Sequence, residues 1–418
     1  MANFTSNTYT LKRKILTFSN KISKQLSKPD RKFTADITYG MLASQSCLLT
    51  DVVDQLHEDS KKINIVDRLS RHLDKGTPAK AAVSYLQMLK KWVLSEPVIY
   101  IDDSDVVKPD GYKFESLGIV RDGSESTSTK NVYKKGYHVT EACVLTGNNH
   151  PVSIFSRIHS SAEKDYKSAN TITFDAIEQG TALFGKATFA MDRGYDDNKM
   201  FLKLDKLGQE YVIRLTSKRK LLYHNKWTPA TELRDRRKGK IKTSVFYKGK
   251  DHEAYLSHVK VQITASRKNI YLVLVYGITE HPMMLATNKE IKSKEDVIQV
   301  ARIYFSRWKI EESTGRNFLC STIGGRRTVC FCRRFCKKGR SAGAGKDRCD
   351  GRRWRSDRLS VLSFGCRYLC RYEAALSGFH PSKLREKELQ REIAVSVLHE
   401  DRELGDPGRY FEESVSAQ

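Results

Sequence analysis

Acidic residues follow two of the apolar runs in this chain, where they could hold a metal ion. In "VIYIDDSDVVKP" the strand-forming run 98–101 leads into Asp102, Asp103 and Asp105, and in "KATFAMDRGYDD" a second run leads into Asp192. Carboxylates crowded at strand ends repel one another unless a cation lies between them. Asp102 and Asp192 are therefore candidate metal ligands. The alternative is that each acidic group forms an ordinary turn.

A third acid lies far along the chain, in the helical stretch "YFSRWKIEE". Tyr304, Arg307 and Glu311 are spaced i, i+3 and i+7, so they share one helix face. Carboxylates from two strand ends and one helix could hold two Mg²⁺ ions, which prefer oxygen ligands. Two such ions about 3.5–4 Å apart stabilise both the attacking and the leaving oxygen of a phosphodiester. The alternative for Glu311 is a solvated helix face.

The elements that would position these acids alternate between strand and helix. Hydrophobic patterning predicts helices over 168–185 and 198–208 and strands over 98–101, 136–146, 150–158, 186–192 and 209–216. The tripeptide "GNN" between the second and third strands predicts a hairpin turn. This order indicates an α/β fold with a mixed sheet covered by helices.

Other segments flank or interrupt this predicted core, which comprises 96–216 and 279–312. Residues 1–95 have apolar residues at helical spacing, which suits either a small DNA-end-binding domain or a helical cap. Residues 217–278 are basic and strand-like, which indicates a β-rich insertion. The chain then returns to the core with a helix from Ser293, where Asp296 three residues on predicts a capping box.

The composition indicates a polyanionic partner. The chain has 74 Lys and Arg against 49 Asp and Glu, a net charge of +25 and a pI near 9.6. Such an excess is typical of nucleic-acid binding, although a solvated basic surface is the alternative. The apolar runs, such as 270–275, have the length of strands rather than of membrane spans. With no secretory leader in the first residues, we expect a cytoplasmic protein with reduced thiols.

Four segments together resemble one family. The spacing of Tyr304, Arg307 and Glu311 is similar to the tyrosine-arginine-glutamate signature of DDE transposases of the insertion-sequence-four family. "IDDSD", "MDRGYDD" and "YVIRLT" resemble that family's first-Asp, second-Asp and following-strand segments. The resemblance covers about 98–312. It implies a ribonuclease-H-like catalytic core with a β-rich insertion, metal-dependent cleavage of mobile-element DNA ends and joining of the 3′-hydroxyls to target DNA.

The resemblance also implies roles for single residues. Asp102, Asp192 and Glu311 would be catalytic ligands of two Mg²⁺ ions, for which Mn²⁺ could substitute. Tyr304, Arg307 and Arg214 would bind double-stranded DNA, on which the protein would act as a dimer.

The choice of first ligand follows from the family pattern Asp-any-Ser/Thr. This pattern fits Asp102-Asp103-Ser104 and therefore favours Asp102 over Asp103. Asp103 should then point to the opposite face of its strand, because successive side chains alternate. We expect Asp105 to form part of a local turn.

The chain departs from the family after Glu312. The family's Lys seven residues after the Glu is replaced here by Phe318. Residues 313–371 hold 16 Lys and Arg against 3 Asp and Glu, and seven of the nine cysteines. Three interpretations of 313–418 remain open: a zinc module, a disordered basic DNA-binding tail, or out-of-frame translation. The cysteine spacing matches no standard zinc pattern.

Three functions are consistent with these observations. The first is a transposase whose activity depends on the segment after Glu312, acting by in-line attack of water and then of a DNA 3′-hydroxyl, with no covalent protein–DNA intermediate. The second is a ribonuclease-H-like nuclease that cleaves without joining strands. The third is a catalytically dead remnant that binds DNA through its basic surface.

Overall fold

The structure is a computed structural model that describes residues 2–76, 79–111, 114–127, 129–147, 149–247 and 249–308. Glu311, Phe318 and the cysteine-rich segment therefore lie outside the described residues. The described chain divides after Tyr85 into two compact units, which are considered separately.

The first unit is helical, as the sequence predicts. Every fourth residue of its second and fourth helices is apolar and buried: Phe33, Ile37 and Met41 in one, Ile65, Leu69 and Leu73 in the other. A four-residue repeat places these side chains on one helix face, where they form a common core. The helices are α1 (Ala2–Ser23), α2 (Lys28–Ser44), α3 (Leu49–Asp54), α4 (Lys62–Lys75) and α5 (Ala79–Leu89), the last of which continues past Tyr85.

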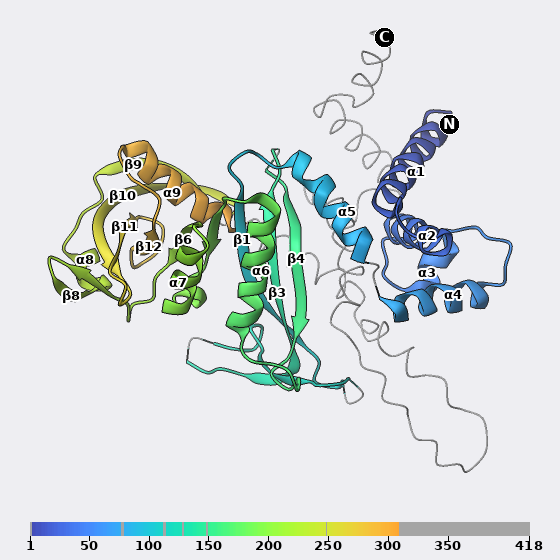
Figure 1. Cartoon of the computed structure of the whole chain (residues 1–418), viewed down its shortest axis with the longest axis horizontal. Coiled ribbons are helices and arrows are strands. Elements are labelled where there is room, and N and C mark those ends of the chain that lie inside the picture. Colours follow the sequence, from blue (N-terminus) through green and yellow to red (C-terminus); the bar gives the residue numbers. More distant parts are fainter. Residues whose placement is uncertain are drawn as a thin grey trace, which may run out of the picture. The chain divides into compact units, whose positions relative to one another are not determined.

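The second unit is a mixed α/β structure built on one large sheet (Figure 1). Its strands are β1 (Val98–Val107), β2 (Gly118–Arg121), β3 (Tyr133–Leu145), β4 (Pro151–His159), β5 (Thr188–Met191), β6 (Glu210–Arg214), β7 (Lys220–Tyr223), β8 (Lys226–Pro229), β9 (Ile241–Tyr247), β10 (Lys250–Ile263), β11 (Lys268–Tyr276) and β12 (Met283–Thr287). Its helices are η1 (Lys90–Trp92), α6 (Ala169–Phe184), η2 (Arg193–Tyr195), α7 (Asn198–Lys206), α8 (Ala230–Asp235) and α9 (Lys294–Ser306). Across the described residues, no helix is both long and apolar enough to cross a membrane.

The strand order is β2-β3-β1-β5-β6-β12-β11-β10-β7-β8, with β4 beside β3 and β9 beside β10. The pairs β1–β5 and β5–β6 are parallel, and the other pairs are antiparallel. The hairpin predicted at "GNN" is confirmed as β3–β4. The capping box is also confirmed: Ser293 accepts a hydrogen bond from the Asp296 amide, and Asp296 accepts one from the Ser293 amide.

The sequence suggested that the acids after Ile101 form a turn, and this prediction is wrong. Strand β1 continues through the acids to Val107, paired along its length with β3. Asp105 makes a hydrogen bond with His138 on β3, at 2.7 Å between Oδ1 and Nδ1, instead of forming a turn. The strand continues because β3 begins at Tyr133, earlier than its apolar pattern indicates, and supplies polar partners for the acids.

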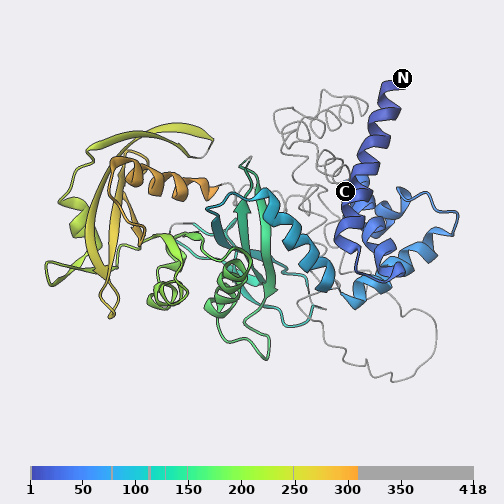
Figure 2. The same ribbon diagram turned by 45° about the horizontal axis from the view of Figure 1, so that its top comes forward.

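The parallel strands β1, β5 and β6 lie between two layers of helices: α6 and α7 cover one face, and α9 covers the other. Ile99, Phe189 and Tyr211 are register neighbours on the face covered by α6 and α7, where a Cβ on Gly180 of α6 would touch Ile99. Tyr100, Ala190 and Val212 form the next row, on the opposite face, and pack with apolar residues of α9 in one buried cluster. The two helical layers can be followed in Figures 1 and 2. Side chains in successive rows of this part of the sheet therefore enter two different environments.

We predict that Gly136→Ala destabilises the second unit. Gly136 lies in β3, where an added Cβ would be 2.3 Å from the carbonyl oxygen of Val106 and 2.6 Å from Val120. Backbone atoms cannot move aside cheaply, so the free energy of unfolding should fall by roughly 1–3 kcal/mol. Urea denaturation measures this change.

The matched control is Gly123→Ala, because a Cβ there meets no heavy atom within 4 Å. Its effect should stay within about 0.5 kcal/mol. Equal stability of the two variants would contradict the close approach of β3 to β1.

Candidate functional site

Three of the candidate site residues lie in one row across the parallel strands β1, β5 and β6. Two residues beyond the row of Tyr100, Ala190 and Val212 come Asp102, Asp192 and Arg214. Every second residue of a strand points to the same face, so these side chains point toward the α9 face. Neighbouring strands are about 4.8 Å apart, and the pairing of β1 with β5 ends at Ile101 and Met191, one residue before each acid. Asp102, within β1, and Asp192, just after β5, thus follow directly on the last paired residues of two adjacent parallel strands.

Helix α9 and its C-cap place Tyr304 and Arg307 beside the row of Asp102, Asp192 and Arg214. The guanidinium of Arg307 forms an ion pair with Asp102, at 3.3 Å between Nη1 and Oδ2. These side chains are only 11% and 19% exposed. The same guanidinium lies 5.9 Å from the ring centroid of Tyr304. The helix therefore places a cation directly against one of the two candidate metal ligands.

Tyr304 joins this group to the third strand. Burial raises the pKa of Tyr304, an effect that Arg307 and a hydrogen bond from Arg214 oppose and that Asp192 reinforces. The structure thus brings together Asp102, Asp192, Arg214, Tyr304 and Arg307. The remaining predicted site residue, Glu311, lies outside the described residues.

Asp192 is fixed by the loop after it. Its Oδ1 accepts a hydrogen bond of 2.6 Å from the amide of Gly194 and so caps η2. Farther along this loop, Asp196 accepts hydrogen bonds from the amide and hydroxyl of Thr216, each 2.8 Å, and from Nε of Arg219 at 2.7 Å. Its side chain is 1% exposed. Asp196 therefore fastens the loop bearing Asp192 to the segment that leaves β6.

Sequence reasoning missed this role of Asp196. The signal was present in "MDRGYDD", where Asp196 and Asp197 follow Asp192 closely. Without the fold, however, nothing indicates that Arg219 lies across the loop from them.

Asp103 points to the opposite face from Asp102, as the alternation of the strand predicts. Its Oδ1 accepts a hydrogen bond of 2.6 Å from Thr140, whose hydroxyl is also 2.9 Å from Nε2 of His159. The His159 ring stacks on that of His138, the partner of Asp105, with centroids 5.6 Å apart. Asp103 and Asp105 therefore belong to a separate polar cluster, on the face of the sheet opposite Asp102.

The donor set suits a hard divalent cation. Asp102 and Asp192 supply carboxylate oxygens, which Mg²⁺ prefers. Within the described part of the chain, no group of three or more His, Cys, Asp and Glu side chains is arranged to hold a metal. Two of the three predicted ligands are thus at hand, and the third lies beyond residue 308.

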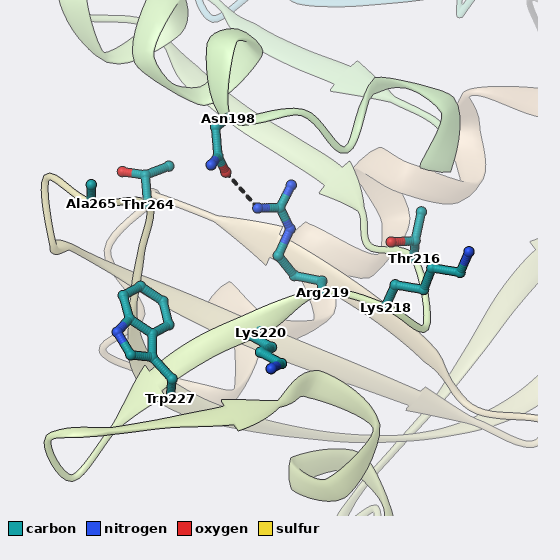
Figure 3. Close-up of a pocket in the computed structure, with 8 residues that line it drawn as sticks. All are labelled: Asn198, Thr216, Lys218, Arg219, Lys220, Trp227, Thr264 and Ala265. Atoms are coloured by element: carbon teal, nitrogen blue, oxygen red, sulfur yellow. Dashed lines mark hydrogen bonds between the residues drawn. The ribbon is translucent and has the colours of Figure 1, made fainter.

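A basic pocket of about 510 Å³ opens beside the start of α7 (Figure 3). Figure 3 shows Arg219 crossing it to hydrogen-bond Asn198, so this arginine is committed to the protein. Lys218 and Lys220 are exposed and pair with no carboxylate of the described residues, and Trp227 is 44% exposed. The lining is Asn198, Thr216, Lys218, Arg219, Lys220, Trp227, Thr264 and Ala265. Neither candidate metal ligand is among these residues.

Comparison with known proteins bears on the same part of the chain. No curated protein matches it. The family model described as "Transposase DDE domain" matches residues 94–316, just over half of the chain. The matched segment contains Asp102, Asp192, helix α9 and the predicted third ligand. The chain therefore belongs to the transposase DDE-domain family.

Proposed function

We propose that this protein is a DDE transposase of the insertion-sequence-four type. Its second unit is a ribonuclease-H-like catalytic core, with 217–278 as an insertion and 1–95 as the part that binds element ends. It cleaves DNA at the ends of a mobile element and joins the freed strands to target DNA. The observation that carries this proposal is that Asp102 and Asp192, directly after the last paired residues of the adjacent parallel strands β1 and β5, face Tyr304 of α9 and Arg307 at its C-terminus.

Each residue of the row has a chemical role in this proposal. Asp102 and Asp192 hold Mg²⁺ or Mn²⁺ together with Glu311. Bound metal would supply Lewis-acid stabilisation of the oxygens that attack and leave at phosphorus. Arg307 and Arg214 orient the DNA, because a guanidinium binds two oxygens of a phosphate at once.

The basic surface fits double-stranded DNA as the substrate. Two exposed lysines beside Trp227, in the pocket next to the Asp192 loop, can contact the phosphate backbone. We further propose that the protein acts in the cytoplasm and as a dimer on DNA, so that two element ends are processed together.

We predict that Asp102→Asn and Asp192→Asn each remove metal binding and cleavage. Misplacing a reacting group by about 1 Å already costs on the order of 10²-fold in rate, so losing a ligand should cost at least that. Calorimetry with Mn²⁺ measures binding, and nicking of DNA carrying the sequences that flank the coding region measures cleavage. DNA binding itself should persist.

Asp205→Asn is the matched control, since Asp205 is an acid of α7 that pairs with Lys268 at 2.7 Å. It should bind Mn²⁺ and cleave DNA like the unaltered protein. The proposal fails if Asp102→Asn and Asp192→Asn behave like this control.

We predict that replacing Lys218 and Lys220 together by Gln weakens DNA binding and its salt dependence. Each lost phosphate contact should make the slope of log K against log salt less negative by about 0.9. Fluorescence anisotropy at several salt concentrations measures the slope.

The control removes two lysines that the protein already pairs. Lys186 contacts Glu210 at 2.9 Å and Lys292 contacts Glu290 at 3.0 Å. Because the net charge changes equally, an equal change in slope would show that overall charge, rather than this pocket, binds DNA.

The sequence after Glu312 favours one competing function, a DNA-binding remnant without catalysis. Phe318 replaces the family's Lys, and the composition changes abruptly there. The frame hypothesis predicts that another reading frame downstream of codon 312 encodes a helix with that Lys. A protein joined to that frame should gain strand transfer with Mg²⁺, whereas absence of such a helix in both frames would reject the hypothesis. Cleavage without joining would identify the nuclease alternative.

A further inference from the structure

Three side chains beside the middle of β1 form a chain of hydrogen bonds, on the face of the sheet away from Asp102. Thr140 has one hydroxyl hydrogen, which it donates to the carboxylate of Asp103. The Thr140 oxygen must therefore accept from His159, so Nε2 of His159 carries the proton. His159 is 2% exposed, and burial lowers its pKa to about 4, with His138 and Arg157 acting in the same direction. A neutral imidazole with its proton on Nε2 thus begins the chain, and Asp103 ends it.

The same carboxylate also meets the loop that carries Asp192. Tyr195, three residues after Asp192, is 6% exposed, and its hydroxyl is fully buried and makes no hydrogen bond of normal geometry with the described residues. The hydroxyl lies beside Asp103, and burial together with the charges of Asp103, Asp102 and Asp192 raises the pKa of Tyr195. Asp103 therefore lies between Thr140 of β3 and Tyr195 of the Asp192 loop.

This arrangement links the two candidate metal ligands through one side chain. Fixing the Asp103 carboxylate fixes the backbone of β1, from which the adjacent Asp102 side chain leaves in the opposite direction. The Tyr195 hydroxyl beside Asp103 belongs to the η2 turn, which Asp192 caps. The β1–β5 pairing in the sheet ends at Ile101 and Met191, so beyond it the relative position of Asp102 and Asp192 needs another constraint.

We propose that Asp103 is a positioning residue, which, held by Thr140 and contacted by Tyr195, sets the separation of the Asp102 and Asp192 carboxylates for metal binding. This inference rests on the proposed function, because it assumes that these two carboxylates are the ligands. Partners that orient metal ligands typically contribute 10–100-fold to metal affinity.

The test measures the Mn²⁺ affinity of the full chain by calorimetry, without DNA. Thr140→Val and Tyr195→Phe each remove one hydroxyl and should each weaken Mn²⁺ binding by about 10-fold or more. Because both hydroxyls act on one carboxylate, the double variant should lose less than the product of the two single losses. Thr140→Ser keeps the hydroxyl and should restore binding to within about threefold.

Two controls separate positioning from general stability. Tyr211→Phe removes another fully buried hydroxyl. Tyr211 lies on β6, and its ring packs on Phe201. Thr188→Val removes a hydroxyl that donates to Glu210, at the other end of β5 from Asp192. Both controls should bind Mn²⁺ like the unaltered protein, even where their melting temperatures fall as far as those of Thr140→Val and Tyr195→Phe.

The outcomes also separate this inference from the proposed function. If the unaltered protein binds no Mn²⁺, or Asp192→Asn binds it equally well, the proposed function fails. If Asp192→Asn loses binding but Thr140→Val and Tyr195→Phe do not, positioning is overturned and the metal site stands. If, in addition, Asp103→Asn abolishes binding, Asp103 is itself a ligand.

Discussion

The site depends on the parallel pairing of β1, β5 and β6. The in-step register of these strands brings Asp102, Asp192 and Arg214 into one row at the carboxyl ends of β5 and β6. A shift of one residue in either pairing would send one of these side chains to the opposite face. The fully buried residues of these strands, including Ile99, Phe189 and Tyr211, make such a shift costly. The packing that holds these strands in register therefore also fixes the geometry of the candidate site.

Polar side chains lie on both faces of the sheet beside this row. On the α9 side, Arg307 pairs with Asp102 and lies against Tyr304, which accepts a hydrogen bond from Arg214. On the other side, Thr140 links Asp103 to the buried His159 through two hydrogen bonds. Consecutive acids in the sequence thus have different surroundings, because the strand directs them to opposite faces. The ion pair of Asp196, in the loop after β5, with Arg219, on the segment that leaves β6, holds the end of β5 in place.

The sequence predicted the elements well where apolar periodicity was strong, as in α6, α7, β5, β6 and the capped start of α9. It also named five candidate site residues, from segments that resemble a known family, and the structure brings these five together. It missed the extension of β1 through the acids, since charged residues are poor strand formers until a partner such as Thr140 or His138 is known. Long-range partners of this kind, including Arg219 for Asp196, are set by topology and have no local signal.

The ion pair between Asp102 and Arg307 has a consequence for the order of binding events. Asp102 already has a counter-ion, so a divalent cation has to share this carboxylate with a guanidinium or displace it. Any anion that draws Arg307 away therefore strengthens the hold of Asp102 on a metal. Thermodynamic reciprocity then requires the metal to strengthen the binding of that anion by the same factor. A single charged contact thus makes the two ligands of such a site cooperative, with no movement of the sheet.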